Sequence, residues 1–274
     1  MKRFVQFLGA ATLLLSFTQC SEDATTDSAP SVQGSVKLTA SINETRTELS
    51  GNDVLWKSND CLGLFCGTKF VNAPFTTTAG GTTSADFTGD PTDPSGSEAE
   101  VFYAYYPYSA HAVLEGSVVS GLSIPAVQTF ATKSFATELC PMATSGADYS
   151  RLAFRTIGTV LKFQVTGQKN VTKIELTGNN GEALAGDYTI DFVGETPEMK
   201  FSGTETTLTL TCSEPVALND ASATEFYFVL PAGVEFTKGI TVKVYTDDNA
   251  EPMVKEYASP LTTRPNKLVT VKAF

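Results

Sequence analysis

Residues 35–42 read SVKLTASI, and their side chains alternate strictly between polar and apolar. Successive side chains of a β-strand point to opposite faces of a sheet. The apolar positions Val36, Leu38, Ala40 and Ile42 therefore share one face. The segment is predicted to be a half-buried β-strand.

The rest of the chain repeats this kind of pattern in short runs that are separated by turn-forming sequences. Residues 89–97 (GDPTDPSGS), 178–182 (GNNGE) and 245–252 (YTDDNAEP) are such turns. No stretch sustains a helical period with caps, and only 18% of residues are charged. Many short strands between turns predict an all-β protein built from β-sandwiches. The predicted strands lie within residues 61–66, 68–75, 84–89, 100–108, 116–125, 151–167, 171–179, 186–192, 207–212, 225–231, 239–248 and 266–274.

The domain organisation follows from one long irregular stretch, Pro125 to Tyr149, which is the predicted junction. A chain of 274 residues is long enough for two β domains of ordinary size. We therefore predict an N-terminal β-sandwich at residues 34–148 and a C-terminal β-sandwich at residues 149–274.

The first twenty residues, MKRFVQFLGAATLLLSFTQC, have the features of an export signal. Lys2 and Arg3 precede a short apolar run that is too short to span a bilayer comfortably. A cysteine at the cut site predicts a lipoprotein, with residues 1–19 removed as signal peptide and Cys20 acylated. Residues 20–33 are polar and are predicted to form a flexible tether. The alternative is an ordinary secreted protein in which Cys20 merely lies near the cut.

The charge balance limits the partners of this protein. Thirty acidic residues against 19 lysines and arginines give a net charge of −11. An acidic chain is a poor ligand for nucleic acid or for anionic lipid, so neither is expected as a partner.

Four cysteines remain beyond Cys20: Cys61, Cys66, Cys140 and Cys212. An exported protein can form disulfides. However, Cys61 and Cys66 are five positions apart and point to opposite faces of a straight strand. A bridge between them would require a turn, and four free thiols are the favoured interpretation.

No catalytic, cofactor or metal constellation is evident in the sequence. The single histidine, His111, has no nucleophile elbow, and the acidic turn at Asp247 and Asp248 lacks the ligand spacing of a calcium loop. No CxxC pair, phosphate loop or dinucleotide fingerprint occurs. The aromatic run at 102–108 could stack on sugars, but alternation along a strand favours a core role. The protein is therefore predicted not to be an enzyme, although a hydrolase whose two carboxylates meet only in space stays a remote third possibility.

Several short landmarks occur along the chain in a characteristic order. They are Glu44-Thr45-Arg46-Thr47, Trp56, Leu62-Gly63-Leu64-Phe65, Tyr103-Ala104-Tyr105-Tyr106-Pro107-Tyr108, Ile124-Pro125-Ala126-Val127-Gln128, Cys140-Pro141-Met142-Ala143, Leu161-Lys162-Phe163, Phe226-Tyr227-Phe228-Val229-Leu230-Pro231 and Arg264-Pro265-Asn266-Lys267. This ordered set resembles the fimbrillin family of Bacteroidetes, which comprises pilus subunits and pilus-associated lipoproteins. The resemblance covers nearly the whole chain after the export signal.

The resemblance implies two transthyretin-like Greek-key β-sandwich domains in tandem. It also implies that the protein is an outer membrane lipoprotein that is displayed on the cell surface. It implies no cofactor. Its expected partners are other pilus subunits, receptors on host or bacterial surfaces, and the outer membrane through the lipid anchor. The protein would be a shaft, tip or accessory subunit. The alternative function is a surface glycan-binding lipoprotein of a polysaccharide-uptake system.

In polymerising fimbrillins, a protease cuts after an arginine, the first strand leaves, and an extended segment of the next subunit takes its place. Arg46 is the only arginine between Arg3 and Arg151, so a cut there would release residues 35–42. The alternative is that Arg46 is a solvated turn residue. The strand-exchange residues are predicted to be Val36, Leu38, Ala40 and Ile42 in the first strand, and Val269, Val271 and Ala273, which share a face of the last strand.

Overall fold

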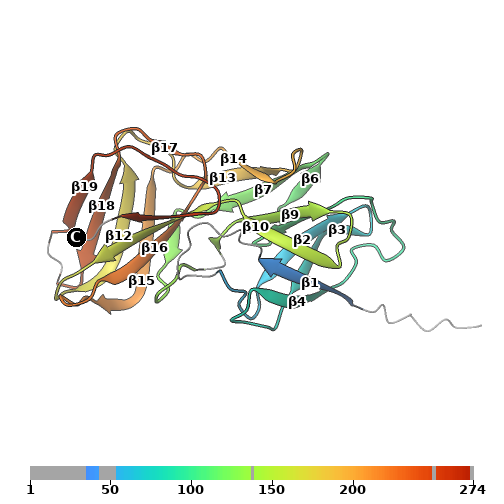
Figure 1. Cartoon of the computed structure of the whole chain (residues 1–274), viewed down its shortest axis with the longest axis horizontal. Coiled ribbons are helices and arrows are strands. Elements are labelled where there is room, and N and C mark those ends of the chain that lie inside the picture. Colours follow the sequence, from blue (N-terminus) through green and yellow to red (C-terminus); the bar gives the residue numbers. More distant parts are fainter. Residues whose placement is uncertain (1–34, 43–53, 137–138, 249–250, 272–274) are drawn as a thin grey trace, which may run out of the picture. The chain divides into compact units, whose positions relative to one another are not determined.

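A computed structural model describes residues 35–42, 54–136, 139–248 and 251–271. These residues form twenty-one β-strands (Figure 1). They contain no α-helix and no helix that is long and apolar enough to cross a membrane. The prediction of an all-β protein is confirmed. The described residues belong to one compact unit.

Seven strands between residues 36 and 156, among them β1 (Val36–Ile42) and β10 (Arg151–Thr156), form a sheet that closes on itself. Within this closed sheet β1 and β10 run parallel, and the other neighbours are antiparallel. The first core cluster fills its interior and includes Leu38, Trp56, Phe87, Tyr106 and Phe154. The strand order is β1 (Val36–Ile42), β10 (Arg151–Thr156), β9 (Met142–Gly146), β5 (Phe102–Tyr106), β2 (Cys61–Cys66), β3 (Phe70–Thr76) and β4 (Ser84–Gly89), which pairs again with β1.

Two further sheets enclose the second core cluster, which includes Phe163, Leu176, Phe228 and Val242. One sheet has the order β16 (Thr224–Leu230), β11 (Thr159–Val165) and β21 (Lys267–Val271). The other has the order β19 (Met253–Tyr257), β18 (Ile240–Thr246), β12 (Asn170–Gly178), β15 (Thr207–Ala217) and β8 (Val127–Thr129). A two-stranded ladder joins β17 (Glu235–Phe236) to β20 (Leu261–Thr262).

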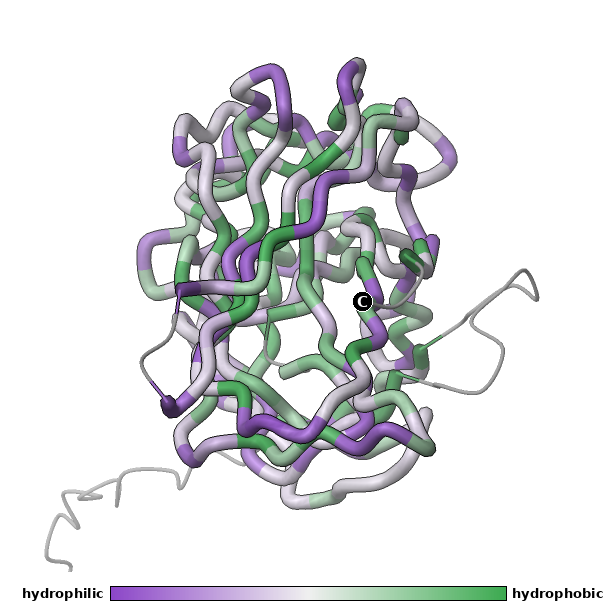
Figure 2. The backbone as a smooth tube through the Cα atoms, turned by 90° about the vertical axis from the view of Figure 1, so that its left-hand side faces the viewer, coloured by the Kyte–Doolittle hydropathy of each residue, from purple (hydrophilic) through white to green (hydrophobic). Residues whose placement is uncertain are grey.

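A fourth sheet covers the outer side of the closed sheet. Its order is β14 (Glu198–Phe201), β13 (Gly186–Asp191), β7 (Val118–Ile124) and β6 (Val113–Glu115). Phe65 and Tyr105 of the closed sheet pack with Val119, Tyr188 and Ile190 in the third core cluster. In Figure 2 the hydrophobic residues recur along the strands, while several of the turns are hydrophilic.

The apolar run at residues 151–167 is predicted as one strand, but it forms two strands in different sheets. β10 enters the closed sheet, and β11 begins after Ile157 and Gly158 in the three-stranded sheet. In the other direction, β7 and β8 pair with β13 and β15. Strands from before residue 149 therefore pair with strands from after it, in both predicted domains. The division into two sandwich domains stays a prediction.

The stretch between Pro125 and Tyr149 was predicted to be irregular, and this was wrong because it contains β8 and β9, whereas its role as a domain junction stays a prediction. Both strands are short, with three and five residues. Segments of this length give too few alternating positions to be distinguished from a loop.

The three-stranded sheet belongs to two cores at once. Val160, Val229 and the partly buried Leu268 contact the first cluster, whereas Leu161 and Phe228 contact the second. This sheet is consequently buried on both faces.

Gln128, which lies on β8 of the five-stranded sheet, connects this sheet to β16 of the three-stranded sheet. Its side-chain Nε2 donates to the carbonyl of Val229 at 2.7 Å, and its Oε1 accepts from the N–H of Val229 at 2.9 Å. The amide thus takes the place of a neighbouring strand for one residue of β16.

A charged network also stabilises β16. Tyr227 donates a hydrogen bond to Glu225 at 2.5 Å, and the ammonium group of Lys162 lies 3.1 Å from the same carboxylate. The hydrogen bond from Tyr227, followed by the contacts with Lys162 and Gln164, lowers the pKa of Glu225.

Candidate strand-exchange site

β1 lies inside the closed sheet and pairs with a neighbour on each side. Six residues pair antiparallel with β4, from Val36 opposite Gly89 to Ser41 opposite Ser84. On the other side, residues 39–42 pair in parallel with residues 151–154 of β10. Removing β1 would leave two unpaired strand edges facing each other.

The apolar face of β1 fills the core of this sheet. Leu38, Ala40 and Ile42 expose 1%, 0% and 7% of their surface, and Val36 is half-buried against the same cluster. The predicted half-buried strand and its alternation are confirmed. Each of these side chains occupies a position that another extended segment would have to fill.

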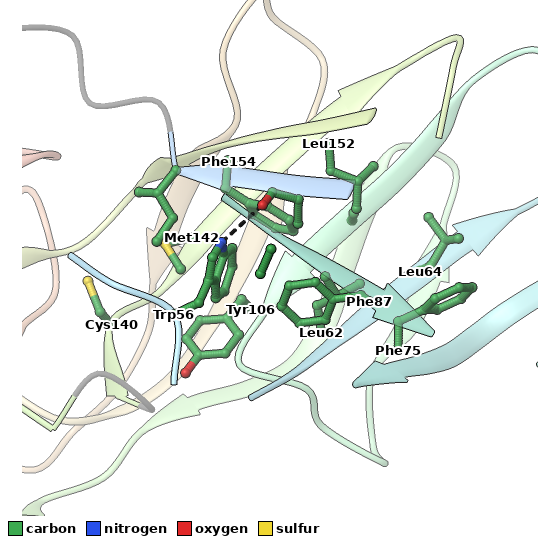
Figure 3. Close-up of a cluster of buried hydrophobic side chains, with 14 of the residues drawn as sticks. Trp56, Leu62, Leu64, Phe75, Phe87, Tyr106, Cys140, Met142, Leu152 and Phe154 are labelled. Carbon is green, nitrogen blue, oxygen red and sulfur yellow. Dashed lines mark hydrogen bonds between the residues drawn. The ribbon is translucent and has the colours of Figure 1, made fainter. Parts of the chain in front are cut away.

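Trp56 holds β1 from inside the core. Its indole Nε1 donates a hydrogen bond of 3.1 Å to the carbonyl oxygen of Ala40 (Figure 3). The indole packs edge-on against Phe87, Tyr106 and Phe154, with ring centroids 5.0, 5.3 and 5.7 Å away. Trp56 is therefore a core residue and not a ligand platform.

The polar face of β1 makes surface interactions. Lys37 forms an ion pair with Asp86 on β4 at 2.8 Å, and Thr39 donates to the same carboxylate at 2.9 Å. The hydrogen bonds from Lys37 and Thr39 lower the pKa of Asp86. Because both charged side chains are more than half exposed, water screens this pair, and the buried face dominates the attachment of β1.

The last strand is placed differently. Among the described residues β21 pairs with β11 alone, in parallel, and so ends its sheet. Val269 and Val271 pack together against the second core cluster, as predicted, while Leu268 contacts the first. The outer side of β21 borders a cavity of about 540 Å³ that Tyr257 also lines.

Three predicted positions lie outside the described residues: Cys20, Arg46 and Ala273. Lipidation at Cys20 and processing at Arg46 stay predictions. The same holds for any exchange role of Ala273.

The aromatic run of β5 is core on both faces. Phe102 and Tyr106 belong to the first cluster, and Tyr105 belongs to the third, with Tyr103 packed against it. The hydroxyl of Tyr105 donates a 2.6 Å hydrogen bond to Oδ1 of Asn72. This run therefore presents no aromatic platform for sugars.

The four cysteines in the described part of the chain are not disulfide-bonded. Cys61 and Cys66 lie on one strand without a turn between them. Burial raises the pKa of the Cys61 and Cys212 thiols to about 11. Both thiols are consequently protonated and weakly nucleophilic at neutral pH.

The remaining sequence candidates do not assemble into a site. His111 is exposed, and no metal-binding group of three or more His, Cys, Asp or Glu side chains forms among the described residues. Asp247 accepts a hydrogen bond from Asn170, and Asp248 pairs with Lys169 at 2.9 Å. These two carboxylates are thus engaged with residues at the start of β12 (Asn170–Gly178).

Sequence reasoning missed the role of Gln128. The residue is part of the Ile124–Gln128 landmark, but its partner Val229 lies 101 positions away. A local pattern contains no signal for such a contact.

No protein-family model and no curated protein matches this chain. Solved structures similar to it include candidate cell adhesion proteins from Bacteroides uniformis and Bacteroides ovatus. The first shares 14% identity at a TM-score of 0.48, over 88% of this chain and 93% of that chain. The second shares 13% at 0.49, over 88% and 92%.

A truncated form of the tip fimbrial protein Mfa3 from Porphyromonas gingivalis is also similar, with 13% identity and a TM-score of 0.32 over 84% of this chain and 83% of that chain. These neighbours are bacterial adhesion and fimbrial proteins, the kind of protein that the sequence landmarks resemble. Identities of 13–14% and TM-scores below 0.5 carry no argument about function.

Proposed function

We propose that this protein is a structural or adhesive component of a bacterial cell-surface pilus. It is exported as an outer membrane lipoprotein anchored through Cys20, and it assembles with other subunits by β-strand exchange at β1. It is not an enzyme. The observation that carries the proposal is the position of β1, which is bonded on both sides and is buried along one face.

The free energy favours replacement of β1 by another strand over leaving the gap between β4 and β10 (called the β1 slot) empty. Loss of β1 exposes the buried sites of Leu38 and Ile42, each worth about 1.5–3 kcal/mol. It also leaves unpaired backbone groups on β4 and β10, which is the state that proteins avoid at strand edges. A second extended segment with apolar residues at every other position would restore both the buried apolar contacts and the backbone hydrogen bonds, and it would dissociate slowly.

The proposed donor is β21 of another subunit, because a subunit that is cut after Arg46 no longer carries its own β1. β21 supplies Val269 and Val271 in the required alternation and has a partner on one side only among the described residues. We also propose that the chain forms two transthyretin-like sandwich domains in tandem, and that β10, although it follows residue 149, belongs to the first of them.

Release of β1 requires a cut in the segment that follows Ile42, and Arg46 is the proposed position. The test uses purified full-length protein and an arginine-specific protease. We expect cleavage after Arg46, followed by oligomers that survive unheated SDS. An excess of a synthetic peptide of residues 36–42 should suppress these oligomers, because it fills the β1 slot.

A scrambled peptide of the same composition serves as the control, and Arg46→Gln should block oligomer formation. Cleavage after Arg46 that leaves only monomers would contradict strand exchange. Equal suppression by both peptides would contradict recognition through the alternating face of β1.

A further inference from the structure

A cavity of about 540 Å³, which no residue of β1 lines, lies where four segments of the chain meet. It is lined by the end of β10, by the turn into β14, by residues 232–233 and by residues 265–267. A volume of 300–1,000 Å³ is typical of small-molecule sites. The cavity therefore has the size of a site for one or two sugar rings.

The charges of this cavity differ from those of the whole protein. Arg155 and Lys267 both line it, and neither makes an ion pair or a side-chain hydrogen bond in the part of the chain that the structure describes. The third charged lining residue, Glu198, is paired with Lys200 at 2.6 Å. On a chain with a net charge of −11, two cations that have no partner among the described residues favour binding of an anion in this cavity.

Backbone hydrogen bonds hold the walls in place. The N–H of Asn266 donates to Gly158 at 3.0 Å, and the N–H of Ile157 donates to Pro141 at 2.9 Å. The N–H of Gly233 donates to Thr263 at 3.0 Å. The cavity is therefore organised before any ligand arrives, which lowers the cost of binding.

The uncharged lining mixes apolar and hydrogen-bonding groups. Ile157 and Met199 supply apolar surface, and Asn266 supplies an amide. Thr156 lines the same wall, and its hydroxyl is buried without a hydrogen-bond partner in the described part of the chain. Rotation of this side chain toward a bound hydroxyl would supply the missing partner.

We propose that this cavity binds a sugar that carries a carboxylate, such as a uronic acid or a sialic acid. The guanidinium of Arg155 is suited to bidentate contact with the carboxylate, and Lys267 adds a second positive charge. Asn266 and Thr156 bind ring hydroxyls, while Ile157 and Met199 contact the carbon face. The cavity has no aromatic lining residue, so stacking of neutral sugars is not expected.

The test measures binding to purified full-length protein by saturation-transfer NMR and calorimetry. The probes are glucuronic acid, N-acetylneuraminic acid and neutral glucose. We expect at least one acidic sugar to bind and glucose not to bind. Arg155→Gln and Lys267→Gln should each weaken binding about tenfold, as for loss of a charge-assisted hydrogen bond. Arg151→Gln is the matched control, because Arg151 lies on the same strand outside the cavity.

Circular dichroism and the thermal midpoint establish that each variant is folded. Failure of both acidic sugars to bind, or equal binding of glucose, would overturn the proposal. So would an equal loss in Arg151→Gln. Binding of sulfate or of a short Asp/Glu peptide without binding of either acidic sugar would also overturn it, because the cavity would then be a general anion site. None of these outcomes depends on polymerisation, so the pilus proposal is tested separately.

Discussion

Replacing Trp56 with phenylalanine should release β1 from the core while leaving most of the packing in place. The change removes the indole N–H that donates to the Ala40 carbonyl at 3.1 Å. A buried acceptor that loses its partner costs about 1–3 kcal/mol. The smaller ring also leaves a void of roughly 40 Å³, which costs about 1 kcal/mol at ~24 cal/mol per Å³. We therefore expect the free energy of unfolding to fall by about 2–4 kcal/mol.

The assay combines urea unfolding with hydrogen exchange. Trp56 is the only tryptophan, so unfolding must be followed by far-UV circular dichroism and not by tryptophan fluorescence. Exchange of the amides of residues 36–42 should accelerate more than exchange elsewhere in the closed sheet. Phe75→Leu is the control, because Phe75 is buried in the same cluster but makes no hydrogen bond to β1. A loss below 0.5 kcal/mol, or equal acceleration of β1 exchange in the control, would refute the reasoning.

Three further predictions test other parts of the account. Gln128→Leu removes both hydrogen bonds to Val229 and leaves two buried backbone groups unpaired, so urea unfolding should show a loss of about 2–4 kcal/mol. An unchanged free energy of unfolding in Gln128→Leu would contradict the bridging role. The pKa of Glu225 lies below its usual value, so its contribution to stability is present above about pH 4.3 and is lost as pH falls through the lower pKa of the folded state. Glu225→Gln should therefore be less stable than the parent at pH 7 and equal to it near pH 2, and a difference that is the same at both pH values would contradict the assignment. Because burial raises the pKa of Cys61 and Cys212 to about 11, Ellman's reagent should label native protein slowly at pH 8 and label it fully in urea without reductant. Rapid native labelling, or labelling in urea only after reduction, would contradict free, protonated thiols.

Although local patterns missed β19, whose burial alternates over five residues, they predicted many of the longer strands. β1 is the clearest case, since its four apolar positions all contact one core cluster. The same reasoning failed for residues 151–167, because a continuous apolar run does not show where the chain passes from one sheet to another. The short strands β8 and β9 were missed for a related reason, since three to five residues give little periodicity.

The candidate site was predicted only in part. The alternation identified the face of β1 that is buried, but it could not show that β1 pairs with both β4 and β10. That arrangement depends on pairing with residues 84–89 and 151–154, which are more than 40 positions away. The cavity with Arg155 and Lys267 was also invisible in the sequence, because its lining comes from segments between residues 155 and 267.

The central claim is that subunits assemble when β1 is removed and a strand of another subunit takes its place. It is tested most directly on native cells. Sheared surface material would be run without boiling and probed with an antibody to this chain, and the rungs would be sequenced from their N-termini. The account predicts a ladder resistant to SDS whose rungs begin at Thr47. A single band that retains the N-terminus at Cys20 would contradict it.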